Sequence, residues 1–350
     1  MSCVLGIETT CDETACAIVR DGRKVRSNVV RTQIDLHQKY GGVVPEIAAR
    51  AHIEWLNDIV AEAMRRAAVG PADITGIGVA NCPGLIGCLL VGVSAAKALA
   101  FAWDKPLLGV NHVHAHLYAS CLIPPEDISD QPSLPHDSPP LPALGLVISG
   151  GHTTLYAVES FQALQRLGST IDDAVGEAFD KVAAILQLGY PGGPLVETLA
   201  RRGHADAVKF PLSLLGKESL DFSFSGLKTA VLYHVNGARG TQRTSADLSP
   251  QQRADTAAAF LRTVVEILEI KVRRALEISH PKSLIVGGGV SANQAVREAL
   301  QRVADRAGIP LFLPVMAYCT DNAAMIAGLA AELLAHGQQA DLDLSVIATA

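Results

Sequence analysis

The chain has 350 residues, of which 49% are hydrophobic and 18% are charged, and its formal net charge is −6. This composition is typical of a soluble globular protein, and the length suffices for two domains or for one large α/β unit. The acidic balance argues against a protein that binds nucleic acid through bulk electrostatics alone, so a nucleic-acid partner would require local basic patches or another subunit.

The cysteines and the apolar segments bear on the compartment. Seven cysteines, an odd number with no C-x-x-C pair, argue against a disulfide framework and against a thiolate zinc site. The N-terminal residues lack the basic region of a signal peptide. The apolar segment Leu85–Ala102 contains Lys97 and many small residues, so we expect a buried helix rather than a membrane span. These features predict a cytoplasmic protein with reduced thiols and no membrane contact.

The chain begins with a predicted β-meander whose first turn is acidic. Residues Cys3–Thr9 and Ala15–Val19 alternate as strands, and the polar turn between them carries Asp12 and Glu13 beside several hydroxyl groups. Glu8 lies at the end of the first strand. Carboxylates beside hydroxyls suit the handling of magnesium and phosphate, although an ordinary solvated turn explains the same residues.

The following segments alternate between helices and strands, as in an α/β fold. Glu46–Ala68 is amphipathic and predicts a helix, Ile74–Ala80 predicts a buried strand, and Leu85–Ala102 predicts a second helix. A short strand, Leu107–Val110, comes next and leads directly into a segment rich in histidine.

Three histidines fall within five residues at the start of the next predicted helix. His112 and His116 are four residues apart, so their imidazoles lie one turn apart on one helical face, where they can hold one divalent metal ion. His114 points elsewhere. Any one of these histidines alone is explained as a hydrogen-bonded core or cap residue, but the pair favours a metal site. Two ligands do not complete a site, so we expect a third ligand, most plausibly a carboxylate.

The pattern of the first half starts again after Ile123–Pro142, a stretch rich in proline and serine that we interpret as a linker or surface excursion. Two strands flank the tight turn Ser149–His152, and a later strand, Lys282–Val286, ends in the glycine turn Gly287–Asn293. The next strand and helix copy the strand and histidine helix of the first half, with Asp321 in the place of the histidines. The sequence therefore predicts a duplicated α/β fold.

The duplication supplies the missing metal ligand. A pseudo-twofold arrangement would bring Asp321 to His112 and His116 across a cleft between two lobes, and a His, His, Asp set leaves coordination positions open for catalysis. The alternative is that Asp321 caps the helix that follows it. We expect an N-terminal lobe (1–122), a linker (123–142), a C-terminal lobe (143–336) with a helical insertion at about 160–280, and a tail (337–350).

Glycine-rich turns follow two strands of the second half, although the chain contains neither G-x-G-x-x-G nor a Walker motif. Ser149–Gly151 and Gly287–Gly289 allow close approach of the backbone to a ligand, and Asn293 at a helix start can hydrogen-bond a ribose or a base. The acidic turn of the first half and Ser149–Gly151 are then two hairpins that face phosphate. The glycine turn that ends at Asn293 is one turn that faces a nucleoside. Such a set is typical of the actin-like ATPase and sugar-kinase superfamily, whose duplicated, ribonuclease H-like lobes enclose a central cleft.

Seven motifs, taken together, resemble the tRNA adenosine threonylcarbamoyltransferase family, whose members were once described as O-sialoglycoprotein endopeptidases. The resemblance runs from near Cys3 to near His336. The stretch Ile123–Pro142 is longer than this family leads us to expect. The motifs are Gly6–Thr14, His112–His116, Val147–Thr153, Asp172–Lys181, Tyr190–Pro194, Phe224–Lys228 and Gly287–Asn293.

The resemblance implies a role for each matching residue. His112, His116 and Asp321 match the metal ligands, which usually hold iron(II) and sometimes zinc. Asp12 and Glu13 match acidic residues that activity requires. The co-substrate is threonylcarbamoyl-AMP, which Mg²⁺ can accompany. Its phosphate side would be held by Val147, Ile148, Ser149, Gly150 and Gly151, and its adenosine part by Asp180, Gly193, Glu197 and Asn293.

The resemblance also implies a reaction and partners. The threonylcarbamoyl group moves from threonylcarbamoyl-AMP to the exocyclic amine of the adenosine next to the anticodon, in tRNAs that read codons starting with A. Bacterial members require a paralogous subunit of the same actin-like fold and a small ATPase, and a separate synthase makes the adenylate. We hypothesise that Asp12 or Glu13 assists deprotonation of the attacking amine, while backbone N–H groups of Ser149–Gly151 stabilise the departing phosphate.

Three other functions compete with this interpretation. A zinc metalloprotease would require H-E-x-x-H, whereas Val113 follows His112 and the motif occurs nowhere in the chain. A small-molecule kinase or ATPase of the actin-like fold would explain the phosphate turns but not the histidine pair. A non-catalytic scaffold subunit of the same complex would lack the metal histidines.

Overall fold

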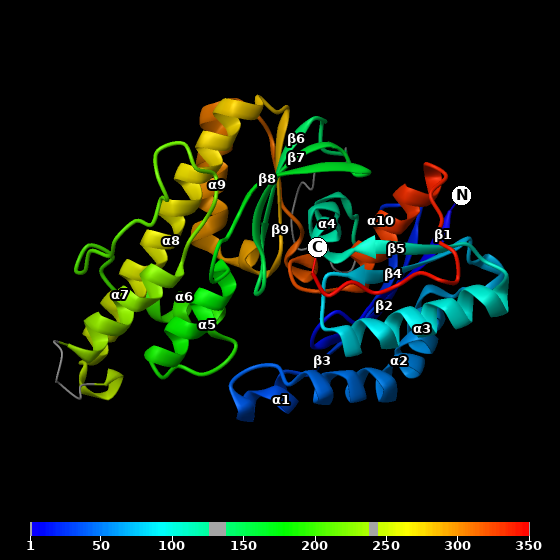
Figure 1. The fold of residues 1–350 in the computed structure, drawn as a ribbon, viewed down its shortest axis with the longest axis horizontal. Helices are drawn as coiled ribbons and strands as arrows, with labels where there is room; N and C mark the ends of the chain where they lie inside the picture. Colours follow the sequence, from blue (N-terminus) through cyan, green and yellow to red (C-terminus); the bar gives the residue numbers. More distant parts are fainter. Residues whose placement is uncertain (1, 126–137, 238–243, 350) are drawn as a thin grey trace. The chain divides into compact units, whose positions relative to one another are not determined.

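The computed structural model describes residues 2–125, 138–237 and 244–349. They form two units, unit 1 (Met1–Pro139, Ser160–Ala163 and Phe312–Ala350) and unit 2 (Pro140–Glu159 and Leu164–Leu311). Each unit is built on one five-stranded mixed sheet (Figure 1). Most of the expected linker, residues 123–142, lies outside the described residues.

The sheet of unit 1 consists of β1 (Cys3–Glu8), β2 (Glu13–Arg20), β3 (Lys24–Thr32), β4 (Gly76–Cys82) and β5 (Leu107–Asn111). Its order is β3-β2-β1-β4-β5, in which β1 pairs antiparallel with β2 and parallel with β4. The expected strands are present. The structure adds the edge strand β3, which the sequence analysis missed because its second half is mostly exposed and, with Val29 and Val30 adjacent, does not alternate.

Four helices pack on this sheet, namely α2 (Pro45–Ala67), α3 (Ile86–Trp103), α4 (His112–Tyr118) and α10 (Ala323–Ala335), and the short helix α1 (Ile34–His37) follows β3. Because side chains alternate along a strand, Leu5 and Ile7 of β1 pack in the core with α2 and α3, whereas Gly6 faces α10. Figure 1 shows α2 and α3 on one side of this sheet and α10 on the other. By length and composition α3 could cross a membrane, yet its residues Val93 and Ala96 belong to this core.

Glycines on two neighbouring strands allow α10 to approach the sheet closely. A Cβ atom added at Gly6 of β1 would lie 2.5 Å from the carbonyl oxygen of Ala323, and one added at Gly78 of β4 would overlap the side chain of Ala330. Neither position leaves room for a methyl group. Since Ala323 is the first residue of α10, this contact fixes where the helix begins relative to β1.

The sheet of unit 2 consists of β6 (Ala143–Ile148), β7 (Thr153–Ser160), β8 (Ala163–Ser169), β9 (Ser283–Gly287) and β10 (Leu311–Phe312). Its order is β10-β9-β6-β7-β8, and β6 pairs antiparallel with β7 and parallel with β9. Both sheets therefore have the same topology, which confirms the predicted duplication.

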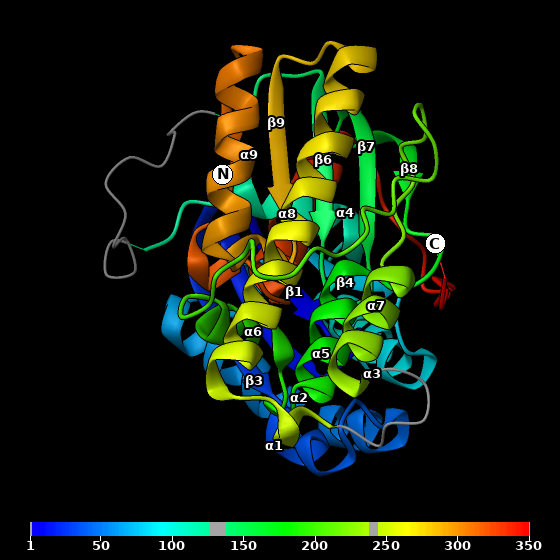
Figure 2. The same ribbon diagram turned by 90° about the vertical axis from the view of Figure 1, so that its left-hand side faces the viewer.

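Figure 2 shows α8 and α9 side by side along the sheet of unit 2. The helices of unit 2 are α5 (Val175–Ile185), α6 (Gly192–Ala200), α7 (Ser225–Asn236), α8 (Pro250–Ser279) and α9 (Gln294–Ala307).

The last part of the chain, from residue 312 onward, belongs to unit 1. α10 packs on β1, β2 and β4, and the tail continues along the same unit, where Ala340 N donates to Leu107 O (2.8 Å) and Ile347 N to Asn81 O (3.0 Å). The expected lobe boundaries stay a prediction. Short 3₁₀ helices complete the described chain, namely η1 (Gln38–Tyr40), η2 (Pro71–Asp73), η3 (Ala119–Cys121), η5 (Ser245–Asp247), η6 (Gly289–Ala292) and η7 (Met316–Tyr318).

Replacement of Gly6 by alanine tests the packing of α10. The added methyl group would overlap the backbone of Ala323 and Ala327, so we expect Gly6→Ala to lower the free energy of unfolding by about 1–3 kcal/mol. Chemical denaturation followed by circular dichroism measures this change. Gly42→Ala is the matched control, because no atom would lie within 4 Å of the methyl group there. Equal stability of the two variants would contradict the packing argument.

Candidate functional site

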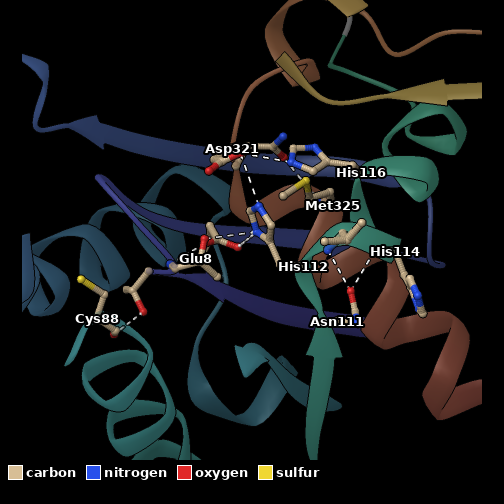
Figure 3. A network of polar contacts seen from close by, with 12 residues as sticks. Glu8, Cys88, Asn111, His112, His114, His116, Asp321 and Met325 are labelled. Atoms are coloured by element: carbon tan, nitrogen blue, oxygen red, sulfur yellow. Dashed lines mark hydrogen bonds and ion pairs between the residues drawn. The ribbon is translucent and has the colours of Figure 1, made fainter. Parts of the chain in front are cut away.

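The histidine pair stands at the start of α4, directly after β5. Asn111 caps this helix, because its Oδ1 accepts hydrogen bonds of 2.9 and 3.1 Å from two backbone N–H groups of the first turn. The cap fixes the helix register, so the rings of His112 and His116 lie one turn apart, with 4.8 Å between their centroids. Figure 3 shows both rings beside Asp321, whereas His114 points away from it.

Asp321 joins the histidines from the residues that precede α10. Its Oδ1 lies 3.1 Å from His116 Nε2 and 3.5 Å from His112 Nε2. Asn322 caps α10, since its side chain accepts a 3.1 Å hydrogen bond from the backbone N–H of Met325. The alternative that Asp321 is the helix cap is therefore wrong, and its carboxylate is directed at the two imidazoles instead.

The three groups come together inside unit 1. His112 and His116 belong to α4, and α10 packs beside α4 on the sheet of the same unit. The expectation that Asp321 reaches the histidines across a cleft between two lobes is thus wrong. The physical reason is the close packing of α10 on Gly6 and Gly78, which brings Asp321 to the N-terminal sheet.

A fourth residue, Glu8, holds one of the histidines (Figure 3). Its side chain is fully buried at the end of β1, its Oε2 lies 2.8 Å from His112 Nδ1, and its Oε1 accepts a 2.6 Å hydrogen bond from the Thr10 N–H. A carboxylate on Nδ1 fixes the tautomer in which Nε2 faces Asp321. The sequence analysis missed this role. A carboxylate that ends a wholly buried strand could have signalled it, because such a charge requires a partner.

The electrostatics of this group favour a cation among its side chains. Burial opposes a charge on His112, but the neighbouring carboxylates of Glu8 and Asp321 outweigh burial and raise the pKa of His112 to about 9. Both ring nitrogens of His116 are buried, and among the described residues neither makes a hydrogen bond, since the 3.1 Å contact between Nε2 and Asp321 Oδ1 lacks hydrogen-bond geometry. The ligand atoms of the two imidazoles and Asp321 lie within 4.8 Å of one another. A divalent cation fits this donor set and would replace the proton that His112 otherwise keeps.

The acidic turn after β1 is near enough to Asp321 for their charges to interact. Burial, followed by the charges of Asp321 and Asp12, raises the pKa of Glu13 well above its usual range. The hydroxyl-bearing residues on either side of the turn, Thr10 and Thr14, are buried. The turn is therefore not an ordinary solvated loop. A cation bound near Asp321 would favour the ionised form of Glu13.

In unit 2, the predicted phosphate-facing residues form the end of β6 and the turn that follows. The side chains of residues 147–148 are fully buried, so only their backbone can reach a ligand. The start of α5 packs on the turn, where Gly176 N donates a 3.2 Å hydrogen bond to Ser149 O. Gly150 and Gly151 face open space, since no atom would lie within 4 Å of a Cβ atom at either position. A ligand can therefore come close to the backbone at the tip of this turn.

The predicted adenosine-facing residues lie near one another in two pairs within unit 2. Asp180 Oδ1 accepts a 2.7 Å hydrogen bond from the first residue of α6, next to Gly193. Glu197 Oε1 accepts one of 3.2 Å from the first residue of α9, next to Asn293. The side chain of Asn293 caps α9. These polar groups have partners within the protein, and their contacts with a substrate stay a prediction.

Comparisons with known proteins place the chain among a family of RNA-modifying enzymes. The family model described as tRNA N6-adenosine threonylcarbamoyltransferase matches residues 24–328. A protein of that name from Symbiobacterium thermophilum is 48% identical over 344 residues, which are 98% of this chain and 95% of that protein. One from Anaeromyxobacter dehalogenans is 47% identical over 346 residues, 99% of this chain and 98% of that protein.

Two solved structures show the fold. HypF of T. kodakarensis superposes with a TM-score of 0.59 at 15% identity and covers 96% of this chain and 48% of that one. Component A of (R)-2-hydroxyglutaryl-CoA dehydratase from Acidaminococcus fermentans gives a TM-score of 0.52 at 15% identity and covers 96% of this chain and 100% of that one. These neighbours have the actin-like ATPase fold, which confirms the predicted α/β class.

Replacement of Glu8 by glutamine tests whether this residue sets metal affinity through His112. The amide keeps the shape of the side chain but removes its charge, so we expect the affinity for iron(II) or zinc to fall about 10–100-fold. Competition with a chromogenic chelator measures this affinity without any activity assay. Glu62→Gln is the matched control, because Glu62 pairs with Arg65 and Arg66 on the surface of α2. Unchanged affinity in Glu8→Gln would show that its contact with His112 plays no part in metal binding.

Proposed function

Because the chain belongs to the tRNA N6-adenosine threonylcarbamoyltransferase family, we propose that it transfers the threonylcarbamoyl group from threonylcarbamoyl-AMP to tRNA. The acceptor is the exocyclic amine of the adenosine next to the anticodon, in tRNAs that read codons starting with A. The observation that supports this proposal most strongly is the family match over residues 24–328, within which His112, His116 and Asp321 converge.

The competing functions fit these observations less well. A metalloprotease would place a glutamate after the first histidine to act as general base, and here Val113 follows His112. A small-molecule kinase or ATPase leaves the convergence of His112, His116 and Asp321 without a purpose. A scaffold subunit would have no need of Glu8 as a buried support for one of the histidines.

A divalent metal ion is the proposed cofactor at His112, His116 and Asp321, iron(II) in the first place and zinc as the alternative. Two neutral imidazoles and one carboxylate suit both ions and leave coordination positions open. When bound, the ion supplies Lewis-acid chemistry to a carbonyl group or holds the threonyl carboxylate. Glu8 keeps His112 in the tautomer that presents Nε2 to the site.

The glycine turn and the helix starts of unit 2 are the proposed site for the AMP part of the co-substrate. Backbone N–H groups of Ser149–Gly151 would stabilise the negative charge that grows on the phosphate as AMP leaves. Asp180, Gly193, Glu197 and Asn293 would contact the adenosine. Mg²⁺ can accompany the phosphate. The open space around the turn supports this assignment, because a ligand can come close to a backbone that carries no side chains.

The acidic turn of unit 1 is proposed to receive the proton that the reaction releases. The amine nitrogen forms a bond to the carbamoyl carbon, the bond between that carbon and the phosphate oxygen breaks, and AMP leaves with the bonding electrons. The amine must lose one proton, which passes to the carboxylate of Asp12 or Glu13. Burial and the charges of Asp321 and Asp12 raise the pKa of Glu13, so its ionised form, which a cation near Asp321 would favour, is a stronger base than the carboxylate of an exposed glutamate.

The enzyme is proposed to act in the cytoplasm together with other proteins. These are a paralogous subunit of the same actin-like fold and a small ATPase, with threonylcarbamoyl-AMP synthase acting upstream. The net charge of −6 supports a tRNA-binding surface shared with a partner, because the chain offers little bulk attraction for a polyanion. All seven cysteines are free thiols, as expected in a reducing compartment.

Transfer of labelled threonine to unmodified tRNA tests the proposal, with threonylcarbamoyl-AMP supplied and partner proteins added singly and together. The transfer rate of His116→Ala should be at least about 100-fold lower than that of the wild type. The loss should be this large because His116 is itself a proposed metal ligand, whereas Glu8 only supports one. His114→Ala, on the same helix but directed away from Asp321, is the matched control and should keep a near-normal rate. No transfer in any combination, or equal losses in the two variants, would contradict the proposal.

A further inference from the structure

Four buried polar side chains lie behind the acidic turn and have no part in the proposed reaction. Thr14, Gln33, His37 and His52 each have a relative exposure of 0%. They come from β2, from α1 and the residue before it, and from α2, so they join separate elements of unit 1. Buried polar groups are costly unless they are hydrogen-bonded. Here they bond to one another and to the backbone of the turn.

At one end of this cluster, His52 and Gln33 hold the backbone of the turn. His52 Nε2 lies 3.0 Å from the carbonyl oxygen of Cys11, and the backbone N–H of Gln33 donates a 2.9 Å hydrogen bond to the carbonyl oxygen of Asp12. A carbonyl group only accepts, so His52 Nε2 carries a hydrogen, and an amide nitrogen only donates, so Nδ1 beside Gln33 Nε2 keeps its lone pair. The Thr14 hydroxyl, 2.7 Å away, and the Gln33 amide nitrogen, 3.4 Å away, then donate to Nδ1.

The other hydrogen bonds of this cluster lead from Gln33 through His37 to the backbone of Val44. Gln33 Oε1 accepts from His37 Nε2 at 3.1 Å, and His37 Nδ1 accepts from the backbone N–H of Val44 at 3.3 Å. Both histidines are therefore neutral, with the hydrogen on Nε2. Burial lowers the pKa of His52, in agreement with this state. One continuous chain of donors and acceptors runs from Val44, before α2, to Cys11 in the turn.

The turn requires such support because it gathers like charges. Asp12 and Glu13 lie in the field of Asp321, and neighbouring carboxylates repel one another. When these carboxyl groups ionise, their repulsion opposes a position of the turn near Asp321, and hydrogen bonds to the backbone of the turn resist such a movement. The two carbonyl groups just before Glu13 are the ones that accept hydrogen bonds from His52 and Gln33.

We propose that His52 is a positioning residue, which fixes the backbone of the turn so that Asp12 and Glu13 keep their place beside Asp321 during transfer. Its kinetic effect rests on the proposed function, whereas the hydrogen-bond chain does not. His52 acts through the carbonyl group of Cys11 and not on the substrate. Its loss therefore lowers kcat and leaves KM for threonylcarbamoyl-AMP nearly unchanged.

Three variants test this role by hydrogen exchange and kinetics. In His52→Ala we expect deuterium uptake of the peptide 9–16 to rise and kcat to fall about tenfold or more, with KM changed less than about twofold. His52→Gln should restore both values, because its amide can donate to Cys11 O and accept from the Thr14 hydroxyl. Leu56→Ala is the matched control, since Leu56 is also buried on α2 but belongs to the apolar core, and peptide 9–16 should stay protected in it.

Several results would overturn the proposal. These are uptake at the wild-type level in His52→Ala, an equal rise in Leu56→Ala, or a rise in His52→Ala with unchanged kcat. If His52→Ala fails to fold, nitrogen chemical shifts of the wild-type imidazole decide, because a charged ring or an Nδ1–H tautomer at neutral pH is incompatible with the chain. Wild-type protein that shows the expected exchange but transfers no threonylcarbamoyl group would refute the proposed function and leave the hydrogen-bond chain intact.

Discussion

The contact between α10 and the glycine face of β1 and β4 determines where the candidate metal ligands meet. Gly6 leaves space for the backbone of Ala323, and Gly78 leaves space for Ala330, so the start of α10 is held against the sheet. Asp321 lies two residues before that start and is carried to the histidines of α4. A segment from the end of the chain thus completes a site whose other members come from its first third.

Charge is the second constraint on this site. The fully buried carboxylate of Glu8 is costly without a positive partner, and His112 contacts it through Nδ1 and the partly exposed Asp321 through Nε2. The acidic turn adds Asp12 and Glu13 to the same neighbourhood, which makes a cation favourable there and a free turn unfavourable. Neutral polar groups restrain the turn, because the hydrogen bonds from His52 of α2 and from Gln33 hold its backbone without adding another charge.

Sequence patterns were sufficient where residues near one another in the chain determine the structure. The spacing of His112 and His116 predicted their shared helical face, and the repeated order of strands predicted two sheets of one topology. Contacts between distant segments could not be derived in this way. Glu8 meets His112 across 104 positions, and His52 meets Cys11 across 41. The duplication identified Asp321 but assigned it to a junction between lobes, because the pattern does not reveal that α10 packs on the first sheet.

Metal K-edge X-ray absorption of protein loaded anaerobically with iron(II), or with zinc, tests the central claim most directly. The account predicts a first shell that contains two imidazole nitrogens and a carboxylate oxygen at about 2.0–2.2 Å. It also predicts that imidazole scattering is lost when His112 and His116 are both replaced by alanine. A first shell without imidazole, or one that stays the same in the double variant, would contradict it.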